Sequence, residues 1–558
     1  MKIVWIAICH RRQNCEAKTK FLKSFQAPNL LGFALLVLAT SGFAETLEVD
    51  TTSDASLSAC EAAIANDCSL RGAIIAANST PAADEIHFNI PQSDAGYQAA
   101  TQHWRISVGN TALPPISEGV VIDGMTQPGA LANTNTPAQG GLNGTLKIEI
   151  VPSASFGSQQ NGLDTASNNF NAPASTLRGL AISRFSSQIQ LGGGGAHRVE
   201  GCYLGTDVTG TLAAVTTNGG RGNGVRLQGP GAFQIGGTLP SQRNLLSGLS
   251  NAVVQQSNPD GLVIAGNLIG TDVTGTLALG NVDAALSFNQ GILRNARIGD
   301  TDPLARNVIA ATRFFAISLS GQGSAPFSGT RIEGNYFGTD WTGTRALGNG
   351  LNPSSPTQAL STIKIGGIVA CDLTIGGPNP GQANLIAYSG KQGIENDQCR
   401  GIQAADNVYV ANRDIGFDNV FGGGAIGATP NDPGDADEQP GNRGQNFPEL
   451  TLGNPNQALV QYRVDTAVAS AAYPITVNFY RAGCGGGAVA RVASATISTV
   501  SAQQALSLDL SATNFLPLTA VAIDALGNQS EFAPALGEEI FNSGFENQAA
   551  ITTLGSCR

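Results

Sequence analysis

Charged side chains are scarce in this sequence, and positively charged ones are the scarcer kind. Of its 558 residues, 13% are charged, with 30 Lys and Arg against 41 Asp and Glu and only four His. No cluster of Lys and Arg resembles a basic patch, which argues against nucleic acid and other polyanions as partners. The seven Cys that follow residue 44 form no C-x-x-C pair and have no neighbouring His, which argues against a zinc site.

Glycine dominates what is present. The chain has 70 Gly, and short runs of Val, Ile, Leu and Ala lie between Gly, Asn, Asp and Thr. This composition is typical of turn-rich, all-β proteins. A chain of this length would ordinarily form three or four domains, but repetitive folds grow along one axis instead, so internal repeats decide the organisation.

The first 44 residues have the features of a secretory signal peptide. Three Lys between positions 18 and 23 precede an apolar run over residues 30–39, and small residues at 42 and 44 suit a cleavage site. The run is too short to span a bilayer, and no later segment is long and apolar enough to do so. Cleavage after Ala44 removes six of the 30 Lys and Arg and one of the 41 Asp and Glu, which leaves a formal net charge of −16.

One nine-residue segment occurs three times. Val199–Asp207, Ile264–Asp272 and Ile332–Asp340 share the pattern G-x-x-x-G-T-D, and their leading Gly residues are 65 and 68 positions apart. A second element interleaves with it, in which an Ile-Gly pair precedes an Asn by nine residues. The Asn of each second element precedes the Asn of the next G-x-x-x-G-T-D unit, or of its degenerate fourth copy, by 23 or 28 residues. Such an interval matches one coil of three short strands, and we expect three coils in each long repeat.

Stacking explains why such coils would be stable. Each coil buries its inward Ile, Leu and Val only against its neighbours, about 4.8 Å away, which also pair with its backbone. Asn tolerates left-handed backbone at a turn, and its amide can bond to the Asn one coil away. The apolar segment 73–77 is expected to form a helix that caps the N-terminal end of the stack.

Two segments resemble a known family. Asn66–Ile74 resembles the CSLREA segment of bacterial secreted and surface β-helix proteins, with Gly72 in place of Glu, and Val121–Gly129 resembles the repeats of the same proteins. These belong to the pectate-lyase-like superfamily. The resemblance covers most of residues 46–425 and implies an all-β fold: a right-handed single-stranded parallel β-helix with a C-terminal β-sandwich. It implies no single chemistry, because the superfamily includes lyases, hydrolases, adhesins and binding proteins.

Changes of pattern predict six regions along the chain. Alternating strands after Phe447 resemble an immunoglobulin-like module. Ile540–Glu546 resembles an I-F-x-x-G-F-E segment on exported proteins of some Gram-negative bacteria, so we expect a secreted or cell-surface location in such a bacterium. The predicted regions are a signal peptide (1–44), a CSLREA-like cap with the first coils (45–110), the β-helix (111–425), an acidic Gly/Pro linker (426–446), an immunoglobulin-like β-sandwich (447–535), and a tail (536–558) that carries a candidate sorting signal.

Seven Cys remain after the leader. Their spacing is compatible with three disulfides in an oxidising compartment and leaves Cys202 over. The candidate pairs are Cys60 with Cys68, Cys371 with Cys399, and Cys484 with Cys557.

Repeated Asp and Arg residues are the first candidates for chemistry. Asp207, Asp272 and Asp340 would lie three coils, or roughly 14 Å, apart, which is too far for the paired carboxylates of a glycosidase and fits turn-forming residues better. Arg243 and Arg306 each precede a repeated Asn, where an Arg is either a lyase base or, as we prefer, a solvated outer residue.

Other enzyme signals are weak. The D-D and G-H-G segments of polygalacturonases are absent, and no Ser, His and Asp arrangement suggests a nucleophile. Outward aromatic residues would stack on sugars, but we favour core positions for those of the G-x-x-x-G-T-D units. They are Tyr203, Tyr336, Phe337 and Trp341.

An acidic loop in the predicted linker is the candidate metal site. Asp432, Asp435, Asp437 and Glu438 place carboxylates that could wrap a hard cation such as calcium, although their spacing departs from an EF-hand. A solvated linker is the alternative interpretation.

These features favour an exported, non-enzymatic β-helix protein that contacts polysaccharide or cell-surface glycan along its flank. The alternative is a polysaccharide lyase or glycoside hydrolase acting in a groove on that flank. An enzyme should carry one non-repeated cluster of carboxylates with an Arg or Lys nearby, whereas a scaffold should show only repeated turn residues there.

Overall fold

The computed structural model describes residues 44–536, with gaps at 110, 155–159, 166–172, 216–219, 322–325, 352–357, 367–370, 421–426, 438–440, 455–458, 484–486, 500–502 and 508–516. Contacts divide the chain into two units, Met1–Ser41 and Gly42–Arg558, and every described residue belongs to the second. Residues 1–43 of the predicted signal peptide and residues 537–558 of the predicted tail lie outside the described part.

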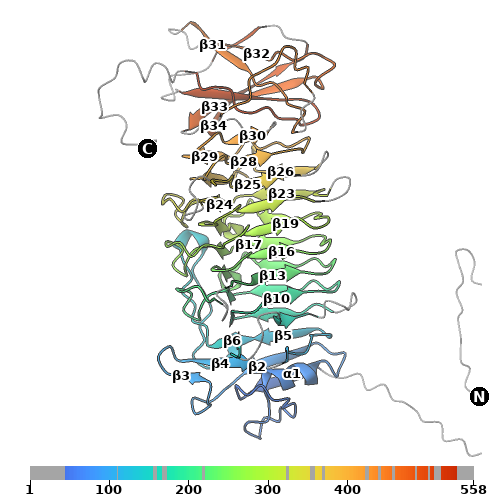
Figure 1. The fold of residues 1–558 in the computed structure, drawn as a ribbon, viewed down its shortest axis with the longest axis vertical. Coiled ribbons are helices and arrows are strands. Elements are labelled where there is room, and N and C mark those ends of the chain that lie inside the picture. The colour runs from blue at the N-terminus through green and yellow to red at the C-terminus, as the bar shows by residue number, and fades with distance from the viewer. Residues whose placement is uncertain are drawn as a thin grey trace, which may run out of the picture. The chain divides into compact units, whose positions relative to one another are not determined.

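Three long sheets of stacked strands form a parallel β-helix, as predicted (Figure 1). All registered pairs within them are parallel except β3 with β4. The ten-stranded sheet contains β1 (Thr46–Val49), β2 (Asp84–Phe88), β5 (Val120–Asp123), β8 (Thr176–Arg178), β11 (Arg198–Glu200), β14 (Gln234–Gly236), β17 (Val263–Ala265), β20 (Arg297–Gly299), β23 (Thr330–Glu333) and β26 (Leu373–Ile375).

The other two sheets complete each coil. The nine-stranded sheet contains β7 (Asn161–Asp164), β10 (Ser187–Leu191), β13 (Asn223–Leu227), β16 (Val253–Gln255), β19 (Leu286–Phe288), β22 (Ile317–Leu319), β25 (Ile363–Ile365), β28 (Ile394–Asn396) and β30 (Phe417–Asn419). The eleven-stranded sheet contains β3 (Tyr97–Gln98), β4 (His103–Val108), β6 (Ile148–Pro152), β9 (Leu180–Ile182), β12 (Tyr203–Leu204), β15 (Leu245–Leu246), β18 (Leu268–Ile269), β21 (Val308–Ile309), β24 (Tyr336–Phe337), β27 (Leu385–Ala387) and β29 (Val408–Val410).

Inward aliphatic side chains stack into one continuous core. Ile235, Ile264 and Ile298 follow one another on the ten-stranded sheet, are registered partners, and are fully buried. The same cluster extends from Leu47 in β1 to Phe532 near the C-terminus. Because burying one such side chain contributes roughly 1.5–3 kcal/mol, a coil gains its stability from the coils on either side.

A ladder of buried Asn side chains lines one corner of the coils, as predicted. In each pair the Nδ2 amide of one Asn donates to the Oδ1 of the Asn one coil further on, at 2.9–3.0 Å. The remaining Nδ2 proton goes to a backbone carbonyl, for example from Asn307 to Ile264 at 2.8 Å. The ladder consists of Asn244, Asn267, Asn307, Asn335, Asn384 and Asn407.

The number of coils per long repeat differs from the prediction. Tyr203 pairs with Leu245, and Leu245 pairs with Leu268, so two coils of unequal length take one repeat from the first G-T-D unit to the second. The 23-residue interval is indeed one coil. The other coil is longer because it carries the G-T-D loop and its continuation outside the sheets. The prediction divided the long repeat into three coils of equal length and so did not allow for this loop.

Helix α1 (Leu70–Ala77) lies at the N-terminal end of the column, where a cap was predicted (Figure 1). Ser69 caps it by accepting the N–H of Gly72, and its apolar face joins the main core. A Cβ atom on Gly72 would lie 1.6 Å from the carbonyl oxygen of Leu57. This close backbone approach leaves no room for a side chain at position 72.

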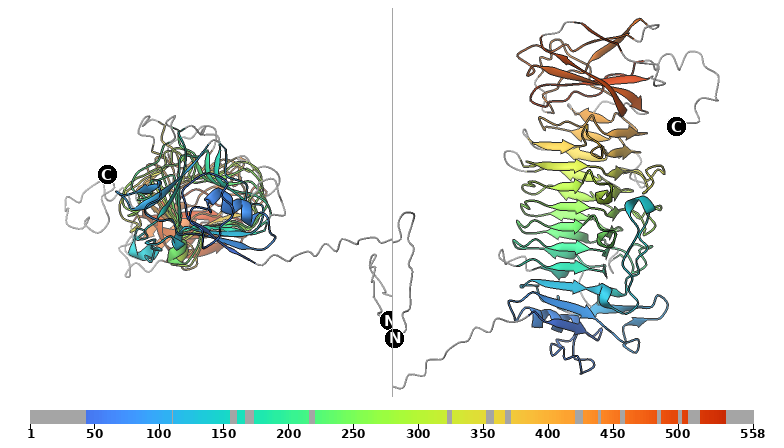
Figure 2. Two further views of the ribbon diagram at one scale, coloured as in Figure 1. Left: turned by 90° about the horizontal axis from the view of Figure 1, so that it is seen from below. Right: turned by 180° about the vertical axis from the view of Figure 1, so that it is seen from behind.

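Residues 124–147, called the flank segment here, lie against the outer face of the eleven-stranded sheet, beside the column in Figure 2. The segment begins with η1 (Gly124–Thr126) and contains η2 (Pro137–Gln139), which contacts η4 (Pro303–Ala305); η3 (Pro240–Gln242) also lies beside it. Leu142 donates its N–H to Val273 at 2.8 Å. A second hydrophobic cluster forms beneath the segment, which includes Leu142, Leu146 and Tyr203.

The C-terminal region consists of two three-stranded antiparallel sheets around their own core. One contains β31 (Glu449–Asn454), β32 (Leu459–Arg463) and β35 (Gln504–Ser507); the other contains β33 (Ile475–Gly483), β34 (Gly487–Ile497) and β36 (Leu518–Ile523). Tyr480 and Phe532 also join the main core, where the ring of Phe532 lies 5.5 Å from that of Tyr409. This region therefore covers the last coil, as α1 covers the first.

Two of the three predicted disulfides are confirmed. Cys60 joins Cys68, with Cα atoms 4.4 Å apart, and Cys371 joins Cys399, with Cα atoms 5.7 Å apart. Cys202 is free, as predicted, and its side chain is buried. Cys484 and Cys557 lie outside the described residues. Among those residues, no helix has the length and apolar character of a membrane span.

Candidate functional site

The carboxylates of the G-T-D loops build turns. Asp207 Oδ1 accepts the N–H groups of Thr211 and Leu212 at 3.1 and 2.9 Å, and Asp272 and Asp340 accept equivalent bonds. The turn-forming interpretation is thus confirmed. The predicted separation of three coils was wrong, because two coils place these residues only roughly 10 Å apart. The evidence for a turn-forming role is therefore the hydrogen bonds that the carboxylates accept within their own loops.

Arg243 is not the solvated outer residue that we predicted. Its side chain is 1% exposed, and its guanidinium donates to the carbonyls of Gly266, Asn135 and Gly140 at 2.9–3.1 Å. Burial lowers the pKa of Arg243 to about 10. The prediction failed because the flank segment, more than 100 residues away in sequence, covers this position and supplies two of the three carbonyls.

Arg306 occupies the equivalent position and also serves packing. Its guanidinium lies 4.1 Å from the ring centre of Tyr336, a cation–π contact, and donates to Gly334 O at 3.3 Å. Neither Arg243 nor Arg306 forms an ion pair with any described carboxylate. Nothing in this arrangement resembles a lyase base beside a metal-binding group.

Of the repeat aromatics, Phe337 lies in the main core, as expected, whereas Tyr203, Tyr336 and Trp341 pack between the eleven-stranded sheet and the flank segment. Tyr203 and Phe337 are buried, and Tyr336 and Trp341 are half-buried against the second cluster. Gly140 of the flank segment lies against the indole of Trp341, since a Cβ there would come within 2.9 Å of it. These rings hold the flank segment to the coils and present little face to a sugar.

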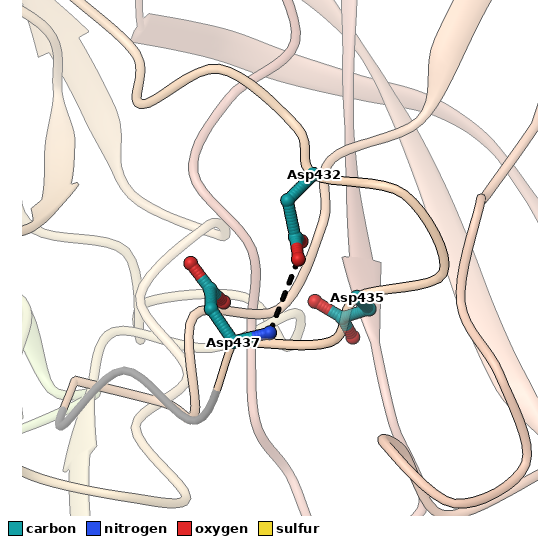
Figure 3. A group of neighbouring side chains, drawn as sticks. All are labelled: Asp432, Asp435 and Asp437. Carbon is teal, nitrogen blue, oxygen red and sulfur yellow. Dashed lines mark hydrogen bonds between the residues drawn. The ribbon is translucent and has the colours of Figure 1, made fainter.

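The acidic loop brings three carboxylates together. Oxygens of Asp432, Asp435 and Asp437 lie within 4.8 Å of one another (Figure 3); Glu438 lies outside the described residues. Asp435 is buried rather than solvated, and accepts bonds from Asn446 N–H at 3.0 Å and Gln445 Nε2 at 3.2 Å. Burial, together with the charges of Asp432 and Asp437, raises the pKa of Asp435 to about 7.

This loop has some properties of a cation site. Asp432 Oδ2 accepts the N–H groups of residues 436 and 437 at 2.8 and 3.1 Å, whereas its Oδ1 is buried and finds no hydrogen-bond partner within the described part of the chain. Three hard oxygen ligands would suit calcium. The donor set is incomplete as it stands, because both oxygens of Asp435 already accept hydrogen bonds.

A pocket of about 350 Å³, partly open to solvent, lies beside this loop and is lined by Asp437, Asn446 and Glu531, among others. Glu531 is 4% exposed and accepts the N–H groups of Asn419 and Thr429. Its carboxyl group interacts with that of Asp418 in β30. Burial raises the pKa of both groups. The charge of Asp418 raises the pKa of Glu531 further, whereas the hydrogen bond with Glu531 partly offsets the rise for Asp418.

A different group of side chains lies on the outer face of the nine-stranded sheet. Each strand of this sheet contributes one residue that lies between two inward-facing ones. These residues are registered partners from strand to strand, so they form one row along the column. Arg226 in this row has an Nε atom that is buried and unpartnered among the described residues, and burial lowers its pKa. The row runs through Asp164, Gln190, Arg226, Val254, Ser287, Ser318, Lys364, Glu395 and Asp418.

Near the C-terminal end of this row is a charged cluster that the sequence did not reveal. Lys364 Nζ lies 2.5 Å from Glu395 Oε1 and 2.6 Å from Asp397 Oδ2, and Ser361 donates its hydroxyl to Glu395 at 2.9 Å. All three charged side chains are partly exposed. Burial alone would lower the pKa of Lys364, but the two carboxylates outweigh it and raise the pKa.

Comparison with known proteins adds no relative: no family model matches this chain, and no curated protein matches it either.

Proposed function

We propose that this chain is an exported β-helix protein of the CSLREA type, with an immunoglobulin-like C-terminal module, that binds polysaccharide or cell-surface glycan without cleaving the glycan chain. The binding surface is the outer face of the nine-stranded sheet. Two disulfides suit the oxidising environment of an exported protein. The formal charge of −16 after the leader favours a neutral glycan over a polyanionic one.

The polar row on this face carries the proposal. Its members repeat at the strand spacing of about 4.8 Å, which suits a linear ligand lying along the column. Arg226 is the most specific feature of the row, because its Nε has no partner among the described residues and buried polar groups normally have one. A sugar oxygen would supply that partner once the half-buried Arg226 side chain turns outward. Ser287, Asn289 and Ser318 extend the row with hydroxyl and amide groups that bond to one another at 3.1–3.2 Å.

The test is binding of residues 45–558 to arrayed plant, algal and bacterial polysaccharides. Arg226→Ala should weaken binding at least tenfold, or about 1.4 kcal/mol. Arg297→Ala is the matched control: it removes an outward Arg from β20 of the ten-stranded sheet, where the side chain is 57% exposed, and should leave binding unchanged. Equal losses in both variants, or binding to no glycan, would refute the proposal.

The second candidate is a polysaccharide lyase or hydrolase, and the Lys364 cluster favours it. This cluster is the non-repeated group of carboxylates with a nearby Lys that an enzyme should carry. It ranks second because Lys364 keeps its proton and already pairs with both carboxylates. Release of reducing ends or unsaturated products from any polysaccharide, lost in both Glu395→Gln and Asp397→Asn, would make catalysis the better proposal.

A further inference from the structure

Three residues near the N-terminal end form a hydrogen-bonded chain from solvent to a buried carboxylate. Thr101 lies in the turn between β3 and β4 and is exposed, whereas His103 and Glu149 are 3% and 2% exposed. Thr101 Oγ1 lies 2.6 Å from His103 Nδ1, and His103 Nε2 lies 3.1 Å from Glu149 Oε2. This group could not be recognised from the amino-acid sequence, because β4 and β6 become neighbours only through the fold.

The direction of each proton follows from the chemistry of the three groups. Burial alone would raise the pKa of Glu149, but hydrogen bonds from His103 and Arg105 outweigh it and lower the pKa. An ionised carboxylate only accepts hydrogen bonds, so His103 Nε2 carries the proton. In a neutral imidazole Nδ1 is then an acceptor, and the hydroxyl of Thr101 donates to it. The lone pairs of Thr101 Oγ1 remain open to solvent.

The surroundings hold this arrangement in place. Gln102, between the two residues, has a left-handed backbone with φ of 52°, which turns the chain so that side chains only two positions apart meet. The ammonium of Lys147 donates to Gln102 O at 2.8 Å and brings a positive charge next to this turn. Arg105 Nε donates to the same oxygen of Glu149, Oε2, that His103 contacts.

We propose that Thr101 is the nucleophile, and His103 the general base, of an acyl-transfer site that cleaves esters of small acyl groups, such as acetyl esters of sugars or other alcohols. Glu149 is a positioning residue that fixes the tautomer and orientation of His103. The substrate class follows from the open turn, where a small acyl group reaches Oγ1 without a deep pocket. This activity is independent of glycan binding on the nine-stranded sheet.

The reaction has two balanced steps. Thr101 Oγ1 bonds to the acyl carbon while its proton passes to His103 Nδ1; the bond to the leaving alcohol breaks, and the alcohol takes that proton. A water molecule then attacks the acyl-threonine and gives a proton to His103, which returns it to Thr101 as the acid leaves. Water is the only co-reactant, and no redox change occurs.

The test uses residues 45–558 with 4-nitrophenyl acetate. Wild type should release 4-nitrophenolate and carry one acetyl group on Thr101, detected by peptide mass spectrometry. Thr101→Ala should lose at least a hundredfold in rate, Thr101→Ser should keep activity, and Glu149→Gln should lower kcat with little change in KM. Thr301→Ala removes another exposed Thr hydroxyl, which bonds to the carboxylate of Asp300 and not to a His, and this variant should react as wild type.

Thermal unfolding of each variant shows whether it is folded, and the exposed position of Thr101 makes its variants well suited to the test. Unchanged ester cleavage in Thr101→Ala, or acetyl groups found only on Lys, would overturn the proposal. If the protein cleaves the ester but binds no glycan, the proposed function is wrong and the acyl-transfer site still stands.

Discussion

Two buried polar networks in this protein differ in charge, and the difference predicts how each end of the column behaves. The Asn ladder is neutral, and each internal amide both donates to the next coil and accepts from the previous one. The junction beneath the C-terminal sheets instead buries Asp418, Asp435 and Glu531. A satisfied neutral network is independent of pH, whereas buried carboxylates depend on protons or cations.

Breaking the ladder should have the largest effect. Asn307→Ala removes an acceptor for Asn267 N–H and Nδ2, both at 3.0 Å, and the donor to Ile264 O and Asn335 Oδ1. Because these partners stay buried, we expect a loss of about 3–5 kcal/mol in the free energy of unfolding, measured by chemical denaturation. Asn289→Ala, at an exposed position, should cost less than about 0.5 kcal/mol. Similar losses in both would mean that the ladder contributes little.

The junction should respond to pH where the ladder does not. The folded-state pKa values of Asp418 and Glu531 are raised above those of the unfolded chain, so their stabilising contribution is complete below about pH 4 and is lost as pH rises toward 8. We expect unfolding of this end to shift to lower temperature over that range, followed by scanning calorimetry or hydrogen exchange. Glu531→Gln should flatten the dependence and be the more stable protein at pH 8. A Glu531→Gln profile parallel to that of wild type would contradict this assignment.

Much of the fold was predictable because its causes repeat in the sequence. Inward Ile and the ladder Asn recur once per coil, so each copy supports the interpretation of the others. The loop lengths do not repeat with the coils, which is why two coils were counted as three. Arg243 was misjudged for a related reason: the flank segment that buries it has no repeat and lies more than 100 residues away.

The candidate sites were less predictable because they are unique. Asp432, Asp435 and Asp437 are close in sequence, so their grouping was visible beforehand, but the burial of Asp435 was not. Lys364 and Glu395 are 31 residues apart and meet only because β25 and β28 are registered neighbours. Without a second copy of such a pair, sequence alone gives no reason to place these side chains together.

Calcium should have the smallest effect on stability. By stabilising the junction at high pH, it would make the junction less dependent on pH and so more like the Asn ladder. At pH 8 the ionised carboxylates of the acidic loop repel one another, and a bound cation would replace that repulsion by attraction. Calorimetric titration of the metal-stripped protein should then show calcium uptake at pH 8, weaker at pH 5, where Asp435 is protonated. The stabilisation would be about 2.7 kcal/mol at a calcium concentration 100 times the Kd.

Variants separate this binding from general charge screening. Asp435→Ala combined with Asp437→Ala should abolish uptake, whereas Asp207→Ala, which removes a turn-forming carboxylate from a G-T-D loop, should leave it intact. Because the cation binds only at the junction, it should not change the loss in free energy of unfolding that Asn307→Ala causes. An absence of heat in wild type would end the calcium hypothesis, and the acidic loop would then affect stability only through the proton that the buried carboxyl group of Asp435 binds.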